Sequence, residues 1–142
     1  MMFMEADKTE GRLIRAYGDW INEYAWDHFA TLTFARRASQ EGAEKSFNGW
    51  ARQLERVAQQ KVSAIATIEG LHWGHVHVHA LVQGCERLDP RQLAEAWKHG
   101  MKTIERFDPE LGAPYYVAKG VGRGDGELVI RGSPEKRSQV ST

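Results

Sequence analysis

Hydrophobic and polar positions along the chain predict helices that alternate with short strands. Apolar residues spaced three and four apart predict amphipathic helices over about residues 8–24 and 42–60. A short helix is expected from Pro90 to about residue 98, because Asp89 can serve as its N-cap. Another is expected to begin at Pro114 and to end in the glycine-rich run 122–126.

The strands are indicated by alternation of apolar and polar residues and by β-branched residues. They are expected at residues 26–34, 62–68, 75–82 and 101–107, with a short strand near 128–130. Residues 70–74 resemble a turn, so the strands on either side of them should form a hairpin.

The order β-α-β-β-α-β predicts an α+β fold, a single-domain antiparallel sheet with helices packed on it, of ferredoxin-like or RRM-like kind. We expect the helices to gather on one side of the sheet. The 142 residues suit one domain. We predict an N-terminal helix over 1–25, a catalytic or binding domain over 26–131 and a flexible tail over 132–142.

Composition limits the classes of function. The chain has 19 basic and 19 acidic residues, so any surface for nucleic acid must be local. The single cysteine, Cys85, excludes an intramolecular disulfide and a cysteine-built zinc site. No apolar run approaches the ~18 residues of a membrane span, and we expect a cytoplasmic protein without a membrane partner.

Three histidines alternate with apolar residues in the predicted strand 75–82. His75, His77 and His79 should therefore share a face, and Glu69 ends the preceding strand. Imidazoles beside a carboxylate suggest a metal site. Zinc hydrolases use similar ligands, but the sequence lacks H-E-x-x-H, and a mixed nitrogen and oxygen site with open positions also suits Mn²⁺ or Mg²⁺.

A pair of adjacent tyrosines lies in the helix that Pro114 begins. Tyr115 and Tyr116 are four and three residues before Lys119, so either phenol can share a helix face with the ammonium group. A nearby cation favours the phenolate, which a tyrosine nucleophile requires.

These motifs together resemble the HUH endonucleases of rolling-circle replication initiators from plasmids, phages and small circular DNA viruses. The resemblance rests on FATLTF (29–34), HVHVHAL (75–81) with Glu69 upstream, and YVAKGVGR (116–123). It implies that Glu69, His77 and His79 hold Mn²⁺ or Mg²⁺, with His75 left open as a further ligand. It also implies that Tyr116 is the single nucleophile and that Lys119 steadies the phosphate or the tyrosine oxygen.

The sequence also departs from relatives in this class. Phage-type members have a second tyrosine directly after the lysine, where this chain has Gly120. The motif G-x-x-x-x-G-K-[ST] of an attached helicase is absent from the sequence. The resemblance thus implies that a host helicase and polymerase act in trans.

The implied reaction is sequence-specific nicking and joining of single-stranded DNA through a 5′-phosphotyrosine link, at a plasmid or phage origin that can include a hairpin. Arg36, Arg37 and Arg123 are expected to contact the DNA backbone, and Trp73 or His72 to stack on a base. Two alternatives are a single-strand transposase of the same chemistry and a non-catalytic module that binds single-stranded nucleic acid.

Overall fold

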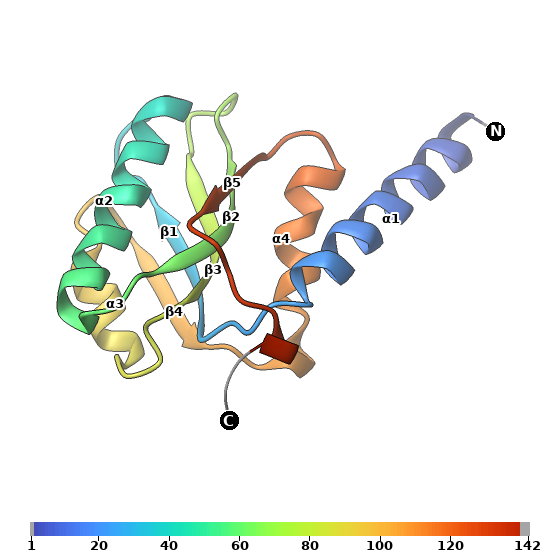
Figure 1. Ribbon diagram of the computed structural model, residues 1–142. Helices are drawn as coiled ribbons and strands as arrows, with labels where there is room; N and C mark the ends of the chain where they lie inside the picture. The colour runs from blue at the N-terminus through green and yellow to red at the C-terminus, as the bar shows by residue number, and fades with distance from the viewer. Residues whose placement is uncertain (1, 140–142) are drawn as a thin grey trace.

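The computed structural model describes residues 2–139, and its centre is one antiparallel sheet with strand order β4-β1-β3-β2-β5 (Figure 1). This confirms the predicted α+β fold on an antiparallel sheet. The strands are β1 (His28–Thr33), β2 (Ser63–Glu69), β3 (His77–Gln83), β4 (Lys102–Arg106) and β5 (Glu127–Arg131).

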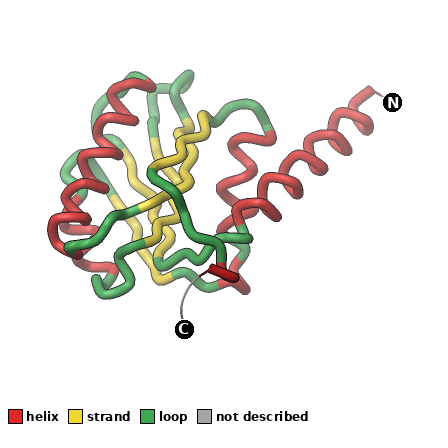
Figure 2. Tube along the Cα trace, viewed as in Figure 1, coloured by secondary structure: helices red, strands yellow, loops and turns green. Residues whose placement is uncertain are grey.

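Helices cover both faces of the sheet (Figures 1 and 2). The four helices are α1 (Met2–Ile21), α2 (Gln40–Ala58), α3 (Pro90–Ala96) and α4 (Ala113–Gly122). The expectation that helices gather on one side holds for α2 and α3, which lie within the β-α-β-β-α-β unit. It is wrong for α1 and α4, which flank that unit in sequence and pack on the opposite face.

Local sequence explains where the helices on the first face begin. The Ser39 side chain caps α2 by accepting a hydrogen bond from the Gly42 backbone N–H at 3.0 Å. Asp89 and Gln92 form a reciprocal capping box at the start of α3, and Pro90 occupies its first turn. The predicted Asp89 cap is therefore confirmed.

The third strand begins two residues later than the alternation predicts. Glu69, the last residue of β2, pairs with His77, and the connecting loop follows Glu69 directly. Residues before His77 consequently have no partner on β2, and His75 lies in the loop. Alternation is a property of the sequence, whereas a strand also requires a neighbour for its backbone hydrogen bonds.

Alternate residues of the strands enter two separate apolar cores. Beneath α2 and α3, fully buried residues such as Leu32 and Val78 pack in one cluster with Phe47. Beneath α1 and α4, Ile65 and Leu81 pack with residues of those helices.

Residues after β5 return along the sheet and are hydrogen-bonded to it. The Gln83 side chain donates to the Glu135 carbonyl and accepts from the Glu135 N–H, each at 2.8 Å, and the Arg137 N–H donates to the Glu23 carbonyl at 2.9 Å. The flexibility of the segment 132–142 stays a prediction, and residues 140–142 lie outside the described part. Among residues 2–139, no helix has both the length and the apolar character of a membrane span.

Candidate active site

The pairing of β2 with β3 brings three potential metal ligands together on the α1/α4 face. Glu69 is opposite His77, and Thr67 is opposite His79. One ligand atom from each of Glu69, His77 and His79 lies within 4.8 Å of the others. His75 is not part of this cluster, because it precedes the strand.

His79 is the buried member of the cluster, with 5% of its surface exposed. Its Nε2 lies 3.2 Å from Glu69 Oε2, and its Nδ1 lies 3.2 Å from the Thr31 hydroxyl on β1. Burial, with a smaller contribution from His77, lowers the pKa of His79 to about 4. The imidazole is consequently neutral at pH 7, which is the form that binds metal.

Thr31 allows His79 to change its role. A hydroxyl can donate to Nδ1 while Nε2–H faces Glu69, or accept from Nδ1–H when Nε2 is free to bind an ion. The sequence interpretation missed this residue. Its signal was its position in β1, two residues before Thr33 on the same face, but only the strand pairing reveals which histidine it contacts.

The chemistry of the donors fits a divalent cation. His77 Nδ1 lies 3.1 Å from the His75 carbonyl, which can only accept, so the ring proton is on Nδ1 and the Nε2 lone pair is available. Burial raises the pKa of Glu69, and the charge of His77 acts against this rise. A bound cation would favour the charged carboxylate here.

Helix α4 places Tyr116 directly beside this cluster. The Tyr116 ring centre is 4.8 Å from that of His79, and the ring also makes an edge contact with Phe29. Nearly half of Tyr116 is exposed (49%), so its hydroxyl side can meet a large substrate. Lys119 Nζ lies 5.8 Å from the Tyr116 ring centre.

The neighbouring Tyr115 points to α1 instead. Its hydroxyl donates to the Asp19 carboxylate, and this hydrogen bond is the main cause that raises the pKa of Tyr115. The phenol of Tyr115 is thereby kept in its protonated form. The structure therefore brings Tyr116 to the histidines and Tyr115 to the helix packing.

Gly120 also has a clear place in the site. A Cβ at this position would lie 3.0 Å from Glu69 Cδ, so a larger side chain would press on the carboxylate. Phage-type relatives have their second tyrosine at the equivalent place. Here α4 approaches the Glu69 carboxylate too closely to accommodate one without a shift.

Arg36 and Arg37 follow β1, at the same end of the sheet as the cluster. They line a cavity of about 960 Å³ together with Lys98, His99 and Lys102, and no acidic residue lines it. Among the described residues, none of these basic side chains has an ion-pair partner. The sequence interpretation missed Lys98, His99 and Lys102, because the backbone bond from Ala35 N–H to the His99 carbonyl joins segments far apart in sequence.

The remaining predicted DNA contacts lie apart from this cavity. Arg123, at the end of α4, is in a 3.1 Å ion pair with Glu10 of α1 and is half exposed. Trp73 is 81% exposed in the loop between β2 and β3, where packing would have hidden it. Gly74 of the same loop faces the Arg37 guanidinium.

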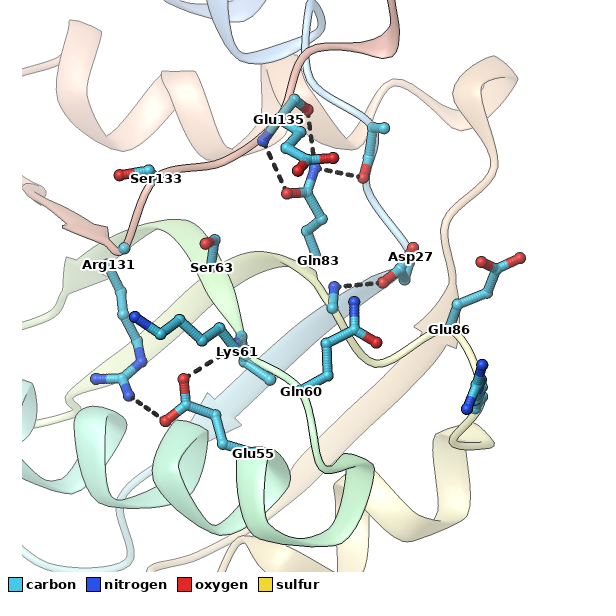
Figure 3. Close-up of a pocket in the computed structure, with 15 residues that line it drawn as sticks. Asp27, Glu55, Gln60, Lys61, Ser63, Gln83, Glu86, Arg131, Ser133 and Glu135 are labelled. Carbon is cyan, nitrogen blue, oxygen red and sulfur yellow. Dashed lines mark hydrogen bonds and ion pairs between the residues drawn. The ribbon is translucent and has the colours of Figure 1, made fainter. Parts of the chain in front are cut away.

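A second cavity, of about 870 Å³, opens at the opposite end of the strands (Figure 3). Its lining includes acidic and basic groups that already satisfy one another. Arg131 contacts Glu55 at 2.9 Å, and Asp27 accepts from the Gly84 and Cys85 N–H groups. It therefore lacks the one-sided charge of the cavity at the histidine end.

The fold and the site define a class: small α+β proteins that place a His-His-Glu cluster, capable of holding a metal, on an antiparallel sheet beside a tyrosine of a covering helix. Residues 27–124 match the family model for the replication-associated protein ORF2, and the chain belongs to this family. The matched range contains β1, the histidine cluster and α4. Curated proteins and solved structures gave no significant match.

Proposed function

We propose that this protein nicks and joins single-stranded DNA in a metal-dependent reaction through a 5′-phosphotyrosine intermediate, and so initiates rolling-circle replication of a plasmid or phage. The observation that carries the proposal is the contact between Tyr116 and His79, a member of the Glu69, His77 and His79 cluster. Membership of a replication-associated family supports a role in replication.

Each residue of the site has a defined task in this proposal. Glu69 and the Nε2 atoms of His77 and His79 hold the cation. Bound there, Mn²⁺ or Mg²⁺ would supply Lewis-acid polarisation of a phosphoryl oxygen. Thr31 fixes the orientation of the His79 ring.

The Tyr116 oxygen attacks the scissile phosphorus. A bond forms between this oxygen and phosphorus, the bond from phosphorus to the 3′-oxygen breaks, and the phenolic proton is lost as the 3′-oxygen gains one. Lys119 stabilises the phenolate and the phosphate charge. Because the phosphotyrosine preserves the ester bond, a 3′-hydroxyl can reverse the reaction and join strands.

The DNA would extend from Tyr116 to the basic cavity. Arg36 and Arg37, with Lys98, His99 and Lys102, offer cations to the backbone phosphates, and the exposed Trp73 offers a ring to a base. Unwinding and synthesis are assigned to a helicase and a polymerase of the host cell, in the cytoplasm.

The nucleophile is tested by paired phenylalanine variants. The protein is incubated with Mn²⁺ and a randomised single-stranded DNA library, and covalent adducts are separated by denaturing electrophoresis. The parent and Tyr115→Phe should form an adduct, whereas Tyr116→Phe should fold and bind DNA but form none. The reverse pattern would assign the nucleophile to Tyr115.

The same experiment separates the alternatives. If the parent binds single strands but never forms an adduct with Mn²⁺ or Mg²⁺, the protein is a binding module without catalysis. If the sequenced junctions match transposon-end hairpins flanking the gene instead of a replication origin, the protein is a transposase.

A further inference from the structure

Helix α1 lies outside the part of the chain that the family model matches, residues 27–124, yet it packs along α4 (Figures 1 and 2). The helix that contains Tyr116 is thus held by an element that the family match does not include. This raises the question of what α1 contributes to the site.

Two glycines allow α1 and α4 to interlock. A Cβ on Gly18 of α1 would overlap the ring of Tyr115 in α4. A Cβ on Gly122 of α4 would lie 2.5 Å from Ile14 Cγ1 in α1. Each helix therefore inserts a large side chain at a position where the other has none.

Polar contacts join the two helices at the same places. The Tyr115 hydroxyl donates to Asp19, the residue after Gly18. Arg123, the residue after Gly122, is in the ion pair with Glu10. The first contact fixes both the depth and the direction of the Tyr115 side chain, whereas the second is exposed and contributes little to stability.

Adjacent residues of a helix point about 100° apart, so the direction of Tyr115 determines that of Tyr116. We propose that Gly18, Asp19 and Tyr115 are positioning residues, which set the rotation of α4 about its axis and thereby aim Tyr116 at Glu69, His77 and His79. This inference rests on the proposed function, in which Tyr116 is the nucleophile.

Gly18→Ala is the most direct test, because alanine favours a helix by roughly 1 kcal/mol over glycine and leaves α1 intact while it displaces the Tyr115 ring. Gly11→Ala is the matched control, since a Cβ on Gly11 of the same helix meets no atom within 4 Å. The rate of adduct formation is measured in a single turnover with saturating Mn²⁺ and a cleavable oligonucleotide.

Gly18→Ala should lower this rate roughly 10- to 100-fold, as expected when a reacting group is misplaced by about 1 Å. Its affinity for the oligonucleotide and for Mn²⁺ should match that of Gly11→Ala. Equal rates in the two variants would overturn the proposal.

A double variant shows whether the effect passes through Tyr115. Tyr115→Ala removes the ring that position 18 would displace, so adding Gly18→Ala to Tyr115→Ala should cause no further loss of rate. A full additional loss would overturn the assignment of Gly18 to this path.

An observation independent of activity keeps this inference distinct from the proposed function. In the metal-free protein, NMR cross-peaks between the Tyr116 ring and the rings of His79 and Phe29 should weaken in Gly18→Ala and persist in Gly11→Ala. If the parent never forms an adduct but these peaks weaken, the proposed nucleophile is wrong while the positioning stands. Unchanged peaks in Gly18→Ala overturn the positioning even if the parent nicks DNA.

Discussion

The two faces of the sheet use the same strands for different purposes. On β3, Val78 and Ala80 face α2 and α3 and are fully buried in an apolar core. Alternating with them in sequence, His77 and His79 face the α1/α4 side and meet Glu69. A shift of one residue in the register of β3 would exchange these two sets.

The contrast separates stability from chemistry. Burial of apolar side chains on the α2/α3 face contributes free energy to folding. Burial of His79 and Glu69 does the opposite, since desolvation is the leading cause of the pKa shift of each. Polar groups held at such a cost are typical of functional sites, although ion-pair networks that serve structure also shift pKa values.

His28 provides a useful comparison with His79. It is fully buried at the start of β1, and its Nδ1 lies 3.6 Å from Cys85 Sγ. Burial lowers the pKa of His28 as well, so this shift alone does not mark a site. What distinguishes His79 is the carboxylate of Glu69 and the ring of Tyr116 beside it.

The largest effect is expected from a cavity on the apolar face. Leu32→Ala should lower the free energy of unfolding by about 2–5 kcal/mol, because Leu32 is fully buried among large side chains. Urea denaturation measures this loss. The Mn²⁺ affinity of the folded variant should stay close to the parent's, and a large change in that affinity would break the separation between the faces.

Removing a ligand on the other face should chiefly reduce metal binding. His77→Ala and His79→Ala should each weaken Mn²⁺ by at least ~10–100-fold, the loss that changes around metal ligands typically cause. Calorimetry provides the measurement. His75→Ala is the control and should bind as the parent does, because His75 lies before β3; an equal loss there would revise the ligand set.

A smaller effect should follow from the orienting hydroxyl. Thr31→Val removes the partner of His79 Nδ1 and should weaken Mn²⁺ about tenfold, near the lower limit for groups that orient a metal ligand. Thr33→Val is a matched control on the same strand and face, where the hydroxyl donates to the Met101 carbonyl at 2.9 Å. Equal affinities in the two variants would show that Thr31 does not orient the ring.

The smallest effect concerns the basic cavity. Arg36→Ala combined with Arg37→Ala should reduce the salt dependence of single-strand binding by about 0.7 for each phosphate that the variant no longer neutralises. Binding to the oligonucleotide is measured over a salt series. Arg91→Ala, which removes an exposed arginine of α3 paired with Glu95, should keep the parent slope. An unchanged slope in the double variant would remove these arginines from the DNA path.

Much of the fold could be predicted because it depends on neighbours in sequence. Helical spacing located α2, and the Asp89-Pro90 pair located the start of α3. Alternation placed His77 and His79 on one face of a strand, and the hairpin brought Glu69 opposite His77. These features follow from backbone periodicity and turn chemistry, which short segments contain in full.

The tertiary structure decided what depends on contacts between distant segments. It placed α1 and α4 on the second face, because α4 buries Val117 and Ala118 against the sheet and α1 then covers α4. It excluded His75 from the cluster by ending β2 at Glu69.

The directions of the two tyrosines were decided in the same way. Periodicity states that Tyr115 and Tyr116 diverge, but not which of them meets the histidines. That choice was made by Gly18 and Asp19, almost one hundred residues earlier in the chain, which receive Tyr115 and so direct Tyr116 to His79. Close packing between helices depends on the shapes of both surfaces, and neither sequence segment contains that information alone.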